Sequence, residues 1–178
     1  MPRSTVARID LEALRHNYRL ASERAAPALS MAVVKADGYG HGIVPVAQAL
    51  ADDAPKYAVA CLGEAEAIRD AGLLQPVVML QGVHAAEDFE LCARRGFEPV
   101  IHGHHQLDWL AQTGARPAFW LKINSGMNRL GFQPDELVQV MTRLEAMGAR
   151  PGLLGFVTHF ACADDNASSM TREQTLCF

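Results

Sequence analysis

The chain has 178 residues, of which 49% are hydrophobic and 20% are charged, and its formal net charge is −4. This length and composition are typical of one sizeable globular domain. The acidic balance and the low aromatic content of 7% argue against nucleic-acid binding. No apolar run approaches the roughly 18 residues of a membrane-spanning helix, so we expect no membrane association.

Residues 1–8 contain no apolar segment typical of a secretory signal, so we expect a cytoplasmic protein. The cysteines form no C-x-x-C pair and follow no zinc spacing, and we expect them to be reduced thiols. The segment His102-Gly103-His104-His105 resembles a metal-binding corner. It has no acidic or cysteine partner at helical spacing, so solvated histidines are favoured and no metal site is predicted.

The chain alternates between two kinds of apolar pattern. Asp10 is placed to cap a helix whose apolar residues, beginning at Leu11, recur every three or four positions. Six apolar runs are then expected to be strands, at 29–34, 57–61, 76–80, 99–101, 118–123 and 153–160. Helical spacing is found at 44–50, 64–71, 85–95, 104–112 and 135–147, and a further helix is expected within 168–178.

This alternation predicts an α/β fold built from parallel βαβ units. Two architectures are compatible with it, an open doubly wound sheet and a closed (β/α)8 barrel. A doubly wound nucleotide-binding sheet should carry G-x-G-x-x-G after its first strand, whereas the glycines here stand at 38, 40 and 42. A barrel needs eight units and the chain supplies six, so counting alone leaves both architectures open.

Lys35 stands directly after the first apolar run, and the glycine-rich segment that follows Asp37 is expected to be a loop. Desolvation disfavours the charged form of a lysine amine held at such a boundary. A neutral amine is a nucleophile that forms Schiff bases with carbonyl compounds, including pyridoxal phosphate (PLP). Taken alone, a lysine at a strand end is more often an exposed surface residue.

Two further segments carry candidate functional residues. Lys122 lies within an apolar run, where a lysine needs a partner, a modification or a path for its amine to reach water. Arg129 follows in a loop, and its planar guanidinium suits a carboxylate or a phenolate oxygen. His159 closes the last run, where a histidine is more often simply hydrogen-bonded than functional.

Together these segments resemble the alanine racemase family. The run 33–42, VVKADGYGHG, matches the family's PLP-attachment motif almost residue for residue. The runs 122–131 and 158–161 match its second and third signatures, and the resemblance extends from about Val6 to the end of the chain. It implies a TIM-like (β/α)8 barrel of PLP fold type III, incomplete at about six of eight units. Residues 1–178 would form part of the N-terminal PLP-binding domain, in which residues 1–10 would be a strand that pairs with a C-terminal β-domain absent from this chain.

The resemblance also implies roles for five residues. Lys35 would hold PLP as a Schiff base and act as one of two bases, exchanging the α-proton on the D-alanine side. Tyr39 would bond to the cofactor phosphate, and His159 would lie against the pyridine ring. Arg129 would contact the phenolic oxygen of the cofactor and the carboxylate of the substrate. Lys122 matches a lysine that is carbamylated in many members, and the carbamate would orient Arg129.

The implied function is racemisation of L- and D-alanine by a cytoplasmic homodimer, for peptidoglycan or for alanine catabolism. The chain departs from the pattern at Asn124-Ser125, where many members have Asp-Thr. The second base, a tyrosine of the C-terminal β-domain, is not in this chain, so we expect the chain alone to be nearly inactive. Two alternatives stay open, a non-catalytic PLP-binding homeostasis protein and a Schiff-base aldolase without PLP. The aldolase would give Tyr39 and Arg129 no joint role.

Overall fold

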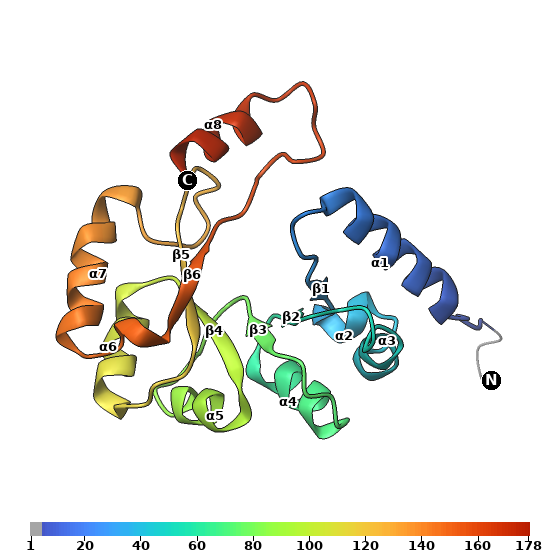
Figure 1. The fold of residues 1–178 in the computed structure, drawn as a ribbon, viewed down its shortest axis with the longest axis horizontal. Helices are drawn as coiled ribbons and strands as arrows, with labels where there is room; N and C mark the ends of the chain where they lie inside the picture. The colour runs from blue at the N-terminus through green and yellow to red at the C-terminus, as the bar shows by residue number, and fades with distance from the viewer. Residues whose placement is uncertain (1–4) are drawn as a thin grey trace. The chain divides into compact units, whose positions relative to one another are not determined.

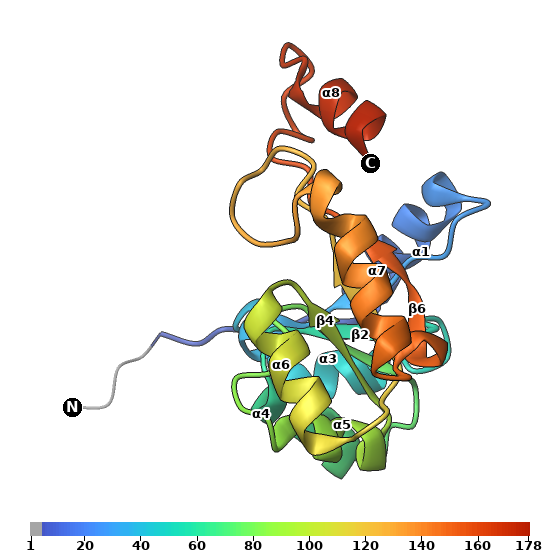
Figure 2. The ribbon, with the colours of Figure 1, turned by 90° about the vertical axis from the view of Figure 1, so that its left-hand side faces the viewer.

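The structure is a computed structural model and describes residues 5–178. Helices and short parallel strands alternate along the chain, as the sequence predicted (Figures 1 and 2). Two compact units are found, a first unit that ends at Val77 and a second unit that begins at Val78. Each unit is described separately below.

The strands follow one another in the order β1-β2-β3-β4-β5-β6. Parallel pairing confirms the prediction of βαβ units. An order that follows the chain without reversal is typical of a barrel, because a doubly wound sheet changes direction at its switch point. The doubly wound alternative is therefore wrong.

The first unit contains two short strands and four helical segments. Its elements are α1 (Leu11–Ala25), β1 (Ala32–Val33), α2 (Lys35–Tyr39), α3 (Ile43–Ala49), β2 (Tyr57–Val59) and α4 (Leu62–Asp70). Strand β1 is shorter than the predicted run 29–34, and it pairs with β2 in the register Ala32 to Tyr57. Ala47, Tyr57 and Ile68 are completely buried and form the centre of this unit's core.

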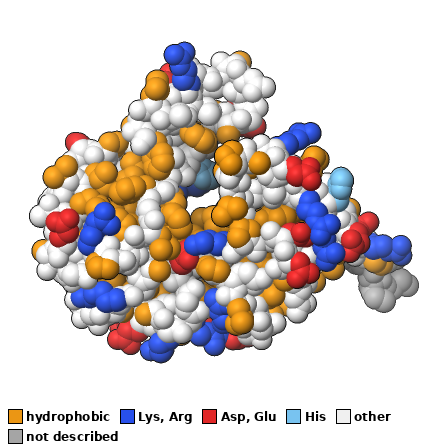
Figure 3. All heavy atoms as spheres, viewed as in Figure 1, with side chains coloured by type: hydrophobic (Ala, Val, Ile, Leu, Met, Phe, Trp, Pro, Cys, Tyr) orange, Lys and Arg blue, Asp and Glu red, His pale blue; other side chains and the backbone are white. Residues whose placement is uncertain are grey.

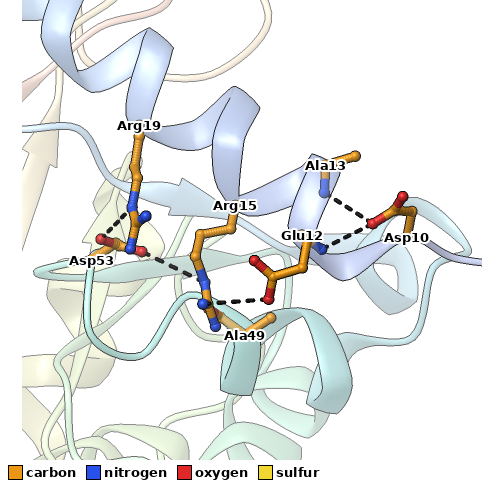
Figure 4. A network of polar contacts seen from close by, with 7 residues as sticks. All are labelled: Asp10, Glu12, Ala13, Arg15, Arg19, Ala49 and Asp53. Atoms are coloured by element: carbon orange, nitrogen blue, oxygen red, sulfur yellow. Dashed lines mark hydrogen bonds and ion pairs between the residues drawn. The ribbon is translucent and has the colours of Figure 1, made fainter.

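Helix α1 is attached mainly by polar contacts, since none of its residues is buried (Figure 4). Asp10 caps the helix as predicted, because its carboxylate accepts two backbone hydrogen bonds in the first turn. Arg15 donates from Nε to the carbonyl oxygen of Ala49 at 3.0 Å. Arg19 donates to the carboxylate of Asp53 at 2.9 Å. These two guanidinium groups fix α1 beside the end of α3.

The second unit contains four strands and its helices. Its elements are β3 (Val77–Met79, which begins at the boundary), α5 (Asp88–Arg95), β4 (Phe97–Ile101), α6 (His104–Thr113), β5 (Phe119–Lys122), η1 (Pro134–Glu136), α7 (Leu137–Ala146), η2 (Arg150–Gly152), β6 (Leu153–Val157) and α8 (Met170–Cys177). Strand β5 lies between β4 and β6, with Trp120 opposite Val100 and Lys122 opposite Val157. Helices α6 and α7 lie side by side along these strands (Figures 1 and 2).

Alternation along β5 separates its two faces. Phe119 and Leu121 lie on one face, and both are buried. Trp120 and Lys122 lie on the opposite face, where Lys122 is buried as well. On β6, Leu154 and Phe156 are 46% and 40% exposed, so its apolar side chains reach the surface. Hydrophobic side chains appear between charged ones over the visible surface in Figure 3.

Among residues 5–178, every helix is too short or too polar to cross a bilayer. The predicted strand over residues 1–10 falls partly on residues 1–4, which lie outside the described part of the chain. Residues 5–10 are in irregular conformation here. The pairing of this segment with a C-terminal domain stays a prediction.

Candidate active site

The segment that follows Lys35 is a tight left-handed turn, where the sequence predicted an irregular loop. Ala36, Asp37, Gly38 and Tyr39 have φ values of 52°, 53°, 62° and 55°. Three of these four residues are not glycine, and the left-handed conformation costs an L-residue roughly 1–2 kcal/mol. The surrounding structure must therefore hold the turn in place.

Hydrogen bonds to the backbone of this turn supply that support. Ala36 donates its N–H to Oε1 of Glu64 at 2.7 Å. The Asp37 carboxylate accepts from the N–H of Ile43 at 2.8 Å, which satisfies the first free donor of α3. The carbonyl oxygen of Asp37 accepts from the N–H of Gly42, also at 2.8 Å. The turn is therefore joined both to α3 and to the first turn of α4.

The turn sets the surroundings of Lys35 and Tyr39. Val34, directly before Lys35, is buried, while Val33 is 41% exposed. Lys35 itself begins the turn directly after Val34 and is half-buried. Tyr39, at the end of the turn, is 60% exposed. The first unit thus presents an amine and a phenol from one turn.

Lys122 and His159 come together in the second unit. Their side chains line one small hollow at the C-terminal ends of β5 and β6. Its lining residues are Lys122, Ile123, Asn124, Ser125, Met127, Leu130, Thr158 and His159. Lys122 is only 9% exposed, whereas His159 is exposed. Arg129 adjoins the lining residue Leu130 but is itself exposed.

The loop that carries Arg129 folds back onto the end of β5. Phe132 donates its N–H to the carbonyl oxygen of Lys122, and Asn124 donates to that of Phe132, both at 2.9 Å. The side-chain oxygen of Asn124 also accepts from the N–H of Asn128 at 2.9 Å. Asn124 therefore holds the loop by its side-chain oxygen.

A buried glutamine on α8 ties this loop to the segment that carries His159. Gln174 is 1% exposed, and its amide nitrogen donates to the carbonyl oxygen of His159 at 2.8 Å. Its amide oxygen accepts from the N–H of Ala161 at 2.9 Å, and its nitrogen also reaches Oγ of Ser125 at 3.3 Å. The hydroxyls of Ser125 and Thr158 are 2.7 Å apart. No pattern in the sequence distinguishes Gln174 as a residue of this site.

The histidines of the segment 102–105 contact groups of the protein itself. His104 contacts the Glu136 carboxylate at 2.9 Å, and this hydrogen bond is the main cause that lowers the pKa of Glu136. Burial is the main cause that lowers the pKa of His102, and the nearby charges of His105 and Lys122 lower it further. Within the described part of the chain, no cluster of three histidine, cysteine or acidic side chains is arranged to hold a metal ion.

Known proteins resemble this chain in sequence and in fold. The family model described as alanine racemase, N-terminal domain, matches residues 9–178. Alanine racemase from Marinobacter nauticus is 59% identical over 178 residues, covering 100% of this chain and 50% of that protein. Catabolic alanine racemase from Pseudomonas aeruginosa is 44% identical over 174 residues, covering 97% of this chain and 48% of that protein.

The crystal structure of biosynthetic alanine racemase from Pseudomonas aeruginosa matches with a TM-score of 0.88 at 38% identity. The match covers 95% of this chain and 48% of the chain in that crystal structure. The predicted TIM-like α/β fold is thereby confirmed over the six strand–helix units present here. The chain spans about half the length of the curated relatives it matches. Because the family match runs over well more than half of the chain, this chain belongs to the alanine racemase N-terminal domain family.

Proposed function

We propose that the protein to which this chain contributes interconverts L- and D-alanine with PLP as cofactor. The observation that carries the proposal is the left-handed turn at the end of β1. Lys35 and Tyr39 lie at the two ends of this segment, and Tyr39 is exposed. The names of the relatives support alanine as the substrate.

The side chains present suit PLP. The cofactor is an aldehyde with a phosphate group, and it needs an amine to hold the aldehyde carbon and donors for the phosphate. Lys35 would supply the amine, and the exposed hydroxyl of Tyr39 would donate to the phosphate. From the family resemblance, His159 would lie against the pyridine ring. Arg129 would bind the phenolic oxygen of the cofactor and the carboxylate of the substrate.

When bound, PLP supplies an electron sink that makes the α-proton of the amino acid acidic. The chain's own contribution is to move that proton. Nζ of Lys35 would exchange it on one face of the substrate, and a base on the other face must serve the opposite enantiomer. The resemblance places that second base, a tyrosine, in a C-terminal β-domain of a partner subunit. We therefore expect this chain alone to racemise alanine very slowly or not at all.

Lys122 would act on Arg129 rather than on the substrate. It is buried near the loop that carries Arg129, and a buried cation is costly unless neighbouring groups compensate it. Carbamylation would turn this cation into an anion that can hold the guanidinium of Arg129 in place. The exposed Arg129 side chain would then be fixed from one side before substrate binds.

The product would serve either of two physiological ends. D-alanine is used in peptidoglycan, and racemisation also opens D-alanine to catabolism. Relatives named biosynthetic and catabolic both match this chain. We propose a cytoplasmic homodimer as the working form, as the family resemblance implies.

Chemical trapping tests the proposal directly. The purified chain is incubated with PLP, reduced with borohydride and digested, and the modified lysine is identified by mass spectrometry. We expect the adduct at Lys35, and its absence there would contradict PLP binding. Racemase activity is then measured on the complete product of the gene. An adduct at Lys35 in a complete product without racemase activity would favour a PLP-binding homeostasis protein.

A further inference from the structure

The carboxylate of Glu64 accepts hydrogen bonds from the backbone just beyond the end of each of the paired strands β1 and β2. It lies in the first turn of α4, and its Oε1 accepts from the N–H of Ala36 at 2.7 Å. Its Oε2 accepts from the N–H of Ala60 at 2.7 Å. Ala36 is the residue directly after Lys35, and Ala60 is the residue directly after β2. One carboxylate therefore bridges the C-terminal ends of two paired strands.

Both hydrogen bonds are of the strong, charge-assisted kind, since an ionised carboxylate accepts them at short distance. The bond to Ala36 acts where the backbone needs support. Ala36 has a φ of 52°, which an L-alanine rarely adopts without outside help. Without this acceptor, the Ala36 N–H would lose its partner and the turn would lose a tie to α4.

We infer that Glu64 is a positioning residue for Lys35. By holding Ala36 in the left-handed conformation, its carboxylate fixes the backbone from which the Lys35 side chain departs. The starting point and direction of the Lys35 side chain are thereby kept constant. This inference rests on the proposed function, because it gives Lys35 the role of the reacting amine.

A simple structural role is the competing explanation. Glu64 would then only join α4 to the strands, and its loss would weaken the first unit as a whole. The two roles differ in which lysines they affect. The chain has three lysines, Lys35, Lys56 and Lys122, so reaction with PLP at each can be followed in one digest.

The test compares Glu64→Gln with the matched variant Glu66→Gln in the 178-residue chain. A glutamine has one acceptor oxygen and one NH2 donor, so it can satisfy only one of the two amides. Glu66→Gln removes a carboxylate from the same helix and leaves the bridge intact. PLP is added, samples are reduced with borohydride at timed intervals, and the adduct at each lysine is quantified.

We expect Glu64→Gln to slow adduct formation at Lys35 by about tenfold, the size of one lost hydrogen bond to a charged group. Lys56 and Lys122 should react as in the unsubstituted chain, and Glu66→Gln should change none of the three. An equal fall at all three lysines would assign Glu64 to the fold alone and overturn the inference. An unchanged rate at Lys35 would also overturn it.

The double variant Glu64→Gln/Ala36→Gly supplies a rescue. Glycine adopts a positive φ without the steric cost that alanine bears, so the turn needs less support. Recovery of much of the Lys35 rate would support the inference, and no recovery would contradict it. These outcomes can be distinguished from a failure of the proposed function itself. Failure of PLP binding is shown by the unsubstituted chain, which would then give no adduct at Lys35 at all.

Discussion

The turn after β1 and the loop after β5 both carry candidate site residues, but they are held in different ways. In the first unit, most of the bonds that fix the turn lie within residues 34–43, and Glu64 adds one from outside. In the second unit, the loop after β5 also has bonds within residues 122–132, and Gln174, which lies 49 residues from Ser125 along the chain, joins it to the segment that carries His159. A site segment can therefore be specified locally, or by a partner that only the fold brings near.

The difference predicts how each region responds to change. Substitutions in the turn should alter chemistry at Lys35 while most of the remaining structure persists. Substitutions around the loop should alter stability, because they break contacts between distant segments.

Lys35→Ala should abolish racemisation by the complete protein, with a loss of about 10³-fold or more, because it removes both the cofactor amine and one base. The measurement is the rate of D-alanine formation from L-alanine. Lys56→Ala is the control and should retain activity. Turnover in Lys35→Ala close to that of the unsubstituted protein would exclude the proposed mechanism.

Gly131→Ala should strongly destabilise the loop after β5. Gly131 has a φ of 123°, and a Cβ there would lie 2.7 Å from the backbone nitrogen of Asn124. Strain and overpacking together should lower the free energy of unfolding by about 2–4 kcal/mol, measured by urea denaturation. Gly148→Ala is the control, because Gly148 also has a positive φ but a Cβ there meets no atom within 4 Å. Equal losses in the two variants would show that close packing at the loop is unimportant.

Gln174→Leu should lower the free energy of unfolding by about 1–3 kcal/mol, because it leaves the N–H of Ala161 and the carbonyl of His159 without their partner. Urea denaturation measures the change. Gln112→Leu, on the exposed side of α6, is the matched control and should have little effect. If both variants unfold alike, Gln174 does not hold the second unit's site segments together.

Cys92 reports on the core of the second unit through pH. Burial raises the pKa of its thiol from 9.0 to about 12. This contribution to stability is complete below pH 9 and is lost as the pH rises towards 12, because the unfolded chain releases the proton first. At pH 10 the loss is about 1.4 kcal/mol.

The check is the pH dependence of urea unfolding between pH 8 and about pH 10.5. Cys92→Ala should show a shallower decline than the unsubstituted chain. Cys177→Ser, at an exposed position, should follow the unsubstituted chain. Parallel curves for all three proteins would mean that Cys92 is not protected from water in the folded state.

The sequence predicted the parallel fold and the helix cap at Asp10, because each depends on local pattern. It did not predict the left-handed turn, since alanine at 36 and tyrosine at 39 are poor indicators of a positive φ. Glu64 carried a weak signal, an acidic residue in the first turn of a helix after a strand. Gln174 carried none, because it lies among polar residues and only the contacts with His159 and Ser125 distinguish it.

The handedness of the turn after Lys35 has a consequence for chemical synthesis. The φ and ψ angles of Ala36, 52° and 51°, are those that a D-amino acid favours. A protein assembled by peptide ligation with D-alanine at position 36 should therefore relax at this point instead of becoming strained. The residue beside the reacting amine would then be one enantiomer of the proposed enzyme's own substrate.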